Sequence, residues 1–137
     1  MGRRQARAAA MQKVYENMLG GDGGQETLQD LIAFEPEEGD TQFIDTVLQG
    51  IKEHEEEIDG MIAAHLKDWS MDRIARVDLS ILRVAVYELV YTPEGSSAAA
   101  AVNEAVTLAQ RFDTPESGKF INGLLRSLLR EREGEQA

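Results

Sequence analysis

The chain has 137 residues, contains no cysteine and carries a formal net charge of −11 at pH 7. This length suits one domain that buries a core without metals or disulfides, and the 42% share of hydrophobic residues favours folding over disorder. The missing thiols exclude cysteine catalysis and cysteine-bound zinc. The acidic balance argues against a strong autonomous nucleic-acid binder, because Lys and Arg supply most of the non-specific affinity for phosphates.

Charge is distributed unevenly along the chain. Residues 1–15 contain four basic residues and no acid, whereas residues 16–59 contain fourteen acids and a single base, Lys52. No apolar run approaches the roughly 18 residues of a membrane span, and the N-terminus lacks the apolar core of a signal peptide. We therefore expect a soluble cytoplasmic protein with a basic head and an acidic flank.

The first predicted helix covers residues 3–19 and buries one apolar stripe. Arg3 and Arg7 lie one turn apart near its start, where a positive charge opposes the helix dipole. Helix stability therefore does not explain these arginines. Two interpretations are open: an anionic partner such as RNA, or a solvated and frayed terminus.

Residues 20–24 are rich in glycine and are predicted to form a flexible connector. They are not expected to bind phosphate, because no strand precedes them and no Gly-Lys-Ser/Thr sequence follows. A short helix is predicted at 25–34, followed by an acidic turn. A long helix is predicted at 40–65, loosened at Gly50 or Gly60.

A row of glutamates beside His54 resembles a metal site at first sight. The HExxH spacing is absent, and adjacent carboxylates point in different directions around a helix. The pattern is more typical of a solvated face, and the same interpretation applies to His65. No metal and no other cofactor is expected.

The next predicted element begins at Trp69 to Asp72, with Ser70 as its N-cap. From Val77 to Tyr91 nearly every position is apolar, which is typical of a helix at the centre of a core. A narrow polar stripe crosses it at Arg76, Ser80, Arg83 and Tyr87. Arg83 must therefore snorkel, pair with a carboxylate or face a ligand, and an internal ion pair and a binding role both remain open.

Two helices joined by a tight corner are predicted between Val102 and Leu129. Thr114 provides an N-cap for the second helix, and Pro115 occupies its first position, where the missing N–H costs nothing. Glu116 lies favourably against the helix dipole. The residues after Arg130 are expected to fray.

The second of these helices has an apolar stripe and a mostly basic face. The basic face contains Lys119, Asn122, Arg126 and Arg130. Of these, Lys119, Asn122 and Arg126 would join Arg3, Arg4 and Arg7 in one basic surface, provided that the first and last helices lie side by side.

Three segments in this order resemble the NusB family of bacterial transcription antitermination factors. They are the arginine-rich start at 3–7, the central stretch 69–89, and the run 103–123 with its Asn-Glu-Ala, Arg-Phe and Glu-Ser-Gly-Lys-Phe-Ile-Asn-Gly motifs. The segment 96–101 departs from the family, since two serines and four alanines stand where a proline and a basic residue are usual. This departure puts in doubt any contact made by that basic position.

The resemblance implies an all-α fold of two small helical bundles in a single domain over residues 1–137. It implies binding to the boxA element of single-stranded leader RNA from ribosomal operons, together with the ribosomal protein NusE. The pair would help RNA polymerase to read through terminators. Whether the protein is a monomer or a homodimer stays open.

The resemblance also implies which side chains face each partner. Asp78 corresponds to the protein-facing part. Independently of the resemblance, two interpretations are open for Tyr15, Phe112 and Phe120: stacking on unpaired bases, with Phe120 favoured because it adjoins Lys119, or packing in the core, which is more usual for aromatics at helical spacing. Glu116 is unusual at an RNA surface because its carboxylate repels phosphate. The RNA-facing residues are Arg3, Arg4, Arg7, Tyr15, Arg83, Glu116, Ser117, Lys119 and Phe120.

Two other functions are weighed against RNA binding. The first is a protein-protein adaptor that lacks sequence-specific RNA binding, which the low pI and the altered segment 96–101 favour. The second is an accessory domain of an RNA methyltransferase, for which the chain has no room for a catalytic domain. No nucleophile with a base, metal triad or nucleotide loop is recognisable, so no enzymatic activity is expected.

Overall fold

The computed structural model describes residues 3–18, 38–66, 70–91 and 97–136, and gives the backbone alone for 3, 4, 38–40 and 134–136. Within these ranges the chain is all-helical and has no strand, which confirms the predicted fold class. The elements are α1 (Arg3–Met18), α3 (Glu38–Glu53), α4 (Glu55–Ala64), the 3₁₀ helix η1 (Met71–Arg73), α5 (Arg76–Tyr91), α6 (Ala98–Phe112) and α7 (Pro115–Gln136). The predicted connector at 20–24, the predicted helix at 25–34 and Trp69 lie outside the described residues.

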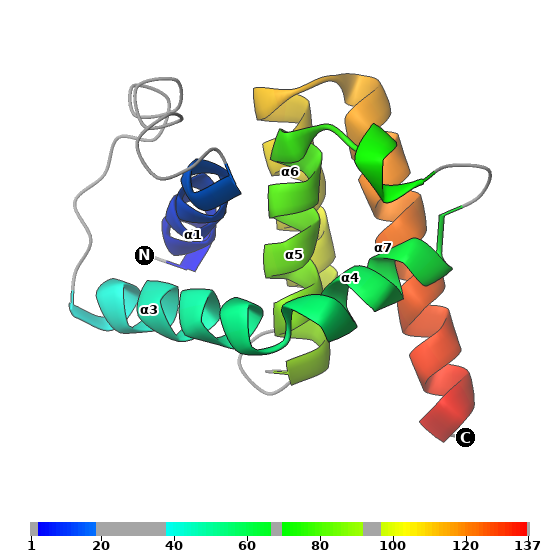
Figure 1. Cartoon of the computed structure of the whole chain (residues 1–137), viewed down its shortest axis with the longest axis horizontal. Coiled ribbons are helices and arrows are strands. Elements are labelled where there is room, and N and C mark those ends of the chain that lie inside the picture. The colour runs from blue at the N-terminus through cyan, green and yellow to red at the C-terminus, as the bar shows by residue number, and fades with distance from the viewer. Residues whose placement is uncertain (1–2, 19–37, 67–69, 92–96, 137) are drawn as a thin grey trace.

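Helix α5 is the centre of the fold (Figure 1). Helices α1 and α3 pack against each other and against α5, while α6 and α7 form a closely packed pair that also contacts α5. Helix α4 follows α3 after a break and also packs against α5 (Figure 1). The prediction that the apolar helix 77–91 lies in the core is confirmed, and even Ser80 and Tyr87 of its polar stripe are buried.

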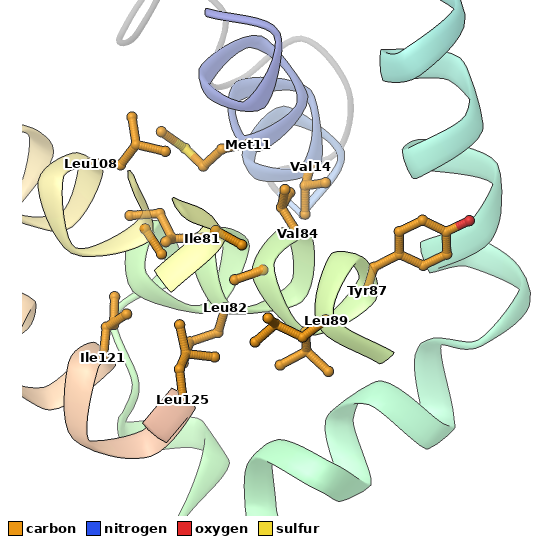
Figure 2. Packing of buried hydrophobic residues seen from close by; sticks show 14 of the residues in the cluster. Met11, Val14, Ile81, Leu82, Val84, Tyr87, Leu89, Leu108, Ile121 and Leu125 are labelled. Carbon is orange, nitrogen blue, oxygen red and sulfur yellow. The ribbon is translucent and has the colours of Figure 1, made fainter. Parts of the chain in front are cut away.

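The core joins side chains from helices that are distant in sequence (Figure 2). Apolar residues at helical spacing form this core. Burying each large apolar side chain contributes roughly 1.5–3 kcal/mol of favourable free energy, which drives the helices together. Figure 2 shows Met11 and Val14 of α1 above Ile81, Leu82 and Val84 of α5, with Leu108 of α6 and Ile121 and Leu125 of α7 closing the cluster.

The long helix predicted at 40–65 is interrupted at His54, and the expectation of a break at Gly50 or Gly60 is wrong. His54 has φ −118° and ψ 20°, and its ring stacks on Tyr91 with centroids 4.2 Å apart. Gly50 has a different role, because a Cβ there would lie 2.1 Å from Cε1 of Tyr87. Glycine is thus required for the close approach of α3 to α5.

Two helix ends also differ from expectation. Ser70 occupies the N-cap position of η1, but its hydroxyl donates to Oδ1 of Asp72 and makes no capping bond. Helix α7 continues to Gln136 instead of fraying after Arg130. Glu131 lies 3.3 Å from Nε2 of His65, and this contact ties the last turns of α7 to the end of α4. None of the described helices combines the length and apolarity needed to cross a bilayer.

Candidate functional site

The corner between α6 and α7 is held by hydrogen bonds among neighbouring residues. Oγ1 of Thr114 accepts from the backbone N–H of Ser117 at 3.0 Å, as the predicted N-cap requires. The Thr114 carbonyl accepts from the Gly118 N–H at 3.2 Å, and Pro115 is the first residue of α7. The Ser117 hydroxyl donates to Oδ2 of Asp113 at 2.8 Å. The corner is therefore stabilised by local hydrogen bonds, as its local sequence predicts.

A pocket of about 660 Å³ opens beside this corner, between α7 and the start of α5. It brings together five of the predicted site residues, although the sequence separates one of them from the other four. The five are Asp78, Glu116, Ser117, Lys119 and Phe120. Asp78, expected to face a protein partner, thus shares a pocket with four residues expected to face RNA.

Asp78 and Asp113 form an acid pair on the wall of the pocket. Burial and the neighbouring Asp113 carboxyl together raise the pKa of Asp78 to about 6, although a hydrogen bond with Ser117 offsets part of the rise. Asp78 is 6% exposed, and no described residue hydrogen-bonds to its Oδ1. A buried acceptor without a donor is costly, so this oxygen lowers the stability of the folded chain.

Exposed side chains of both signs line the pocket. The cations are Arg73, Lys119 and Arg130, the exposed acids are Asp113 and Glu116, and half-buried Phe120 adds an aromatic side chain. Asn122 and Arg126 continue the predicted basic face of α7, where Nε of Arg126 donates to Oδ1 of Asn122 at 3.0 Å. This face can attract an anion despite the acidic total charge of the chain.

Arg7 lies in the interior, so neither of the two interpretations offered for the N-terminal arginines applies to it. The residue is 3% exposed, and its Nε donates to Oε2 of Glu88 at 2.7 Å. Its Nη1 also pairs with Glu104 of α6. A guanidinium enclosed by two carboxylates cannot reach a phosphate in this fold, and we leave Arg7 out of the proposed RNA surface.

Arg83 is paired with acids of α4. Its Nε and Nη2 donate to Oδ1 and Oδ2 of Asp59 at 2.9 and 2.8 Å, and Glu55 lies 3.5 Å from Nη1. The internal ion pair is therefore the interpretation that the geometry favours. A bidentate carboxylate already fills the fork that would hold a phosphate.

The single basic surface expected from the first and last helices does not form. Helix α5 lies between α1 and α7 (Figure 1). Arg3 and Arg4 belong to the first turn of α1, and Tyr15 is half-buried against the core near its end. These residues therefore lie away from the pocket beside α7. Phe112 is also packed against the core, under the guanidinium of Arg111.

The two histidines have structural partners. Nδ1 of His54 lies 2.7 Å from Oε1 of Glu57 on the exposed face of α4, as expected for a solvated face. The same expectation is wrong for His65, whose side chain is 8% exposed and lies 2.9 Å from Oγ of Ser127. Among the described residues, no cluster of three metal-binding side chains occurs.

Among the charged pocket residues, Arg73 and Asp113 had no place in the sequence-based interpretation, and Arg130 appeared there only on the basic face of the last helix. Asp113 has a local signal, since an acid directly before a Thr-Pro cap lies at the corner itself. Its pairing with Asp78 depends on how α5 meets that corner, and no spacing in the sequence reveals this contact.

Comparison with known proteins gives a consistent result over nearly the whole chain. A sequence model described as the NusB family matches residues 4–130. The transcription antitermination protein NusB of Elusimicrobium minutum (strain Pei191) is 37% identical over 140 residues, covering 98% of this chain and 97% of that protein. The protein of the same name from Bacillus subtilis (strain 168) is 36% identical over 128 residues, covering 93% and 95%.

Solved structures share the fold. NusB of T. maritima superposes with a TM-score of 0.81 at 30% identity, covering 96% of this chain and 92% of that chain. A crystal structure of the antitermination factors NusB and NusE in complex with dsRNA gives a TM-score of 0.77 at 25% identity, covering 94% and 96%.

Proposed function

Because the chain belongs to the NusB family, we propose that it is a transcription antitermination factor that binds the boxA element of nascent ribosomal-operon RNA together with NusE. In this role the pair promotes read-through by RNA polymerase. The observation that carries the proposal is the pocket at the α6–α7 corner, where Lys119 and Phe120 meet two further cations in an otherwise acidic chain.

The chemistry of this pocket suits single-stranded RNA. Exposed cations attract the phosphates, and an aromatic side chain gives an unpaired base a surface on which to stack. We propose Glu116, Ser117, Lys119 and Phe120 as RNA-facing residues. Arg3, Arg4 and Tyr15 of α1 form a second contact region, which an extended RNA reaches around α5.

The acidic residues of α3 and α4 suit a basic protein partner by charge complementarity. We propose NusE as that partner, because NusB and NusE occur together in the related complex with RNA. We propose a binding role without catalysis and a cytoplasmic location, in keeping with relatives that are named transcription antitermination proteins.

Fluorescence anisotropy of a labelled boxA-like RNA tests the proposal, with this protein alone and with NusE at one stated salt concentration. We expect weak binding that tightens sharply when NusE is added, and that disappears for a scrambled RNA. A duplex of the same sequence belongs in the experiment, because the related complex contains double-stranded RNA. Binding to NusE without a sequence-selective gain in RNA affinity would instead identify the chain as a protein-protein adaptor.

A further inference from the structure

Two carboxyl groups meet where the start of α5 contacts the α6–α7 corner. Asp78 of α5 is 6% exposed, and its side chain shares a hydrogen bond with that of Asp113, the exposed residue that follows α6. Two carboxyl groups can share a hydrogen bond only when one of them carries a proton, because an ionised carboxylate only accepts. The contact between α5 and the corner therefore contains a proton.

The surroundings assign this proton to Asp78. Burial penalises a charge on Asp78, whereas water can solvate a charge on exposed Asp113. Oδ1 of Asp78 is buried and accepts no hydrogen bond from the described residues, so a negative charge on this group would be poorly solvated. Burial and the Asp113 carboxyl accordingly raise the pKa of Asp78 to about 6.

Hydrogen bonds connect the two carboxyl groups to the residues proposed to face RNA. Oδ2 of Asp113 accepts from the Ser117 hydroxyl at 2.8 Å, and Ser117 also hydrogen-bonds to Asp78. Ser117 lies in the first turn of α7, two residues before Lys119. A change in the distance between the two carboxyl groups would therefore displace the turn that holds Ser117 and Lys119.

We propose that the carboxyl pair of Asp78 and Asp113 is a pH-sensitive contact that regulates RNA affinity: it holds the corner against α5 while it shares a proton, and it loosens when that proton is lost. The inference rests on the proposed RNA-binding function and adds a form of regulation to it. Loss of the proton leaves two carboxylates side by side, and like charges at this distance repel each other. It also adds a negative charge beside the surface proposed for RNA, so both effects lower RNA affinity as the pH rises.

Other charged and titratable side chains surround the pair. Those that line the same pocket are His65, Arg73, Glu116, Lys119 and Arg130. Lysine and arginine stay charged at mildly acidic and neutral pH. Histidine is the side chain that most often titrates in this range, so His65 is the main competing source of a pH effect.

Carbon-detected NMR of the full chain tests the contact without RNA. The carboxyl ¹³C signal of Asp78 should titrate with a midpoint at about pH 6, and the backbone amide signals of Ser117 and Gly118 should shift with the same midpoint. Amide signals of the corner that do not follow the titration of Asp78 would overturn the inference and leave the proposed function standing.

Asp113→Asn removes the second carboxyl group and keeps the shape of the side chain. The amide retains an acceptor for the Ser117 hydroxyl and offers Asp78 a donor that does not depend on pH. The midpoint of Asp78 should therefore fall, although burial keeps it above the ordinary value, and the corner amides should shift less. Circular dichroism checks that the variant folds.

Fluorescence anisotropy of boxA-like RNA, with saturating NusE at constant salt, measures the effect on binding. We expect the affinity of the wild type to fall roughly two- to fivefold between about pH 5 and pH 7, and that of Asp113→Asn to fall less. Asp72→Asn removes the charge of an exposed aspartate outside the pocket, so this control should keep the dependence of the wild type. His65→Gln should keep it too. The RNA and NusE are the same for every variant, so the comparison removes their own pH effects.

The outcomes separate this inference from the proposed function. An equal fall in affinity for the wild type and Asp113→Asn would overturn the inference, as would a fall that disappears only in His65→Gln. In both cases RNA still binds and the proposed function stands. Failure of boxA-like RNA to bind at every pH would overturn the proposed function and the inference together.

Discussion

Nε of Arg7 donates to Oε2 of Glu88 at 2.7 Å, so a buried ion pair joins the first turns of α1 to the last turn of the central helix α5. The same guanidinium also pairs with Glu104 of α6. Burial lowers the pKa of Arg7, but the two carboxylates outweigh this effect and raise it overall. One arginine therefore fixes the position of three helices.

Replacing Arg7 with alanine should cost about 3–5 kcal/mol of unfolding free energy, because it strands two acids in or near the core. Urea denaturation measures this loss. Lys13→Ala is the control, since Lys13 is an exposed cation of the same helix, and its effect should stay within about 0.5 kcal/mol. If Arg7→Ala had the stability of the wild type, the ion pair between Arg7 and Glu88 would not stabilise the fold as its geometry indicates.

Lys119 should contribute to RNA affinity through its charge. Lys119→Ala is expected to weaken binding of all RNA sequences about equally and to reduce the slope of log affinity against log salt by about 1. Anisotropy at several salt concentrations measures both quantities. Lys52→Ala, which removes an exposed cation of α3, should leave the slope unchanged. An unaltered slope in Lys119→Ala would remove this residue from the RNA surface.

Glu116 should weaken RNA binding, because it places an exposed carboxylate beside Lys119 at the pocket. Glu116→Gln keeps the shape and removes the charge, so we expect RNA affinity to rise by roughly two- to fivefold at low salt and by less at high salt. Glu133→Gln removes an exposed charge near the other end of α7 and should change affinity little. A fall in affinity for Glu116→Gln would mean that the carboxylate accepts a hydrogen bond from a base.

The local parts of the site could be predicted from the sequence, and the long-range parts could not. Thr114 and Pro115 encode the corner within a few residues, and the structure has the predicted cap. The burial of Arg7 depends on Glu88, which lies 81 residues away. At the helix break, His54 likewise stacks on the ring of Tyr91 in another helix. Such contacts are set by packing, which helical periodicity does not specify.

The pKa of Asp78 predicts how stability depends on pH. It is raised from 3.8 to about 6 in the folded state, so between these pH values the folded protein binds more protons than the unfolded chain. The contribution of this carboxyl to stability therefore falls as the pH rises from about 4 to about 6. Above about pH 6 the ionised carboxylate lowers the unfolding free energy by its full amount, up to about 3 kcal/mol.

Asp78→Asn isolates this effect from the other acids. The variant should match the wild type in unfolding free energy near pH 4 and exceed it near pH 7, as measured by urea denaturation at both pH values. Asp72→Asn, at an exposed site, should follow the wild type throughout. A difference between Asp78→Asn and wild type that does not change with pH would contradict the raised pKa.

Gly50 and Gly60 make opposite predictions for the same substitution. A Cβ at Gly50 would lie 2.1–2.5 Å from ring atoms of Tyr87, whereas one at Gly60 meets no atom within 4 Å. Gly50→Ala should therefore lower the unfolding free energy by about 1–3 kcal/mol, since α3 must move away from α5. Gly60→Ala should raise it by about 0.5–1 kcal/mol, because alanine loses less backbone entropy in a helix. Thermal and urea unfolding of the two variants measure these changes in unfolding free energy. Changes of the same sign would mean that α3 does not approach Tyr87 of α5 closely at Gly50.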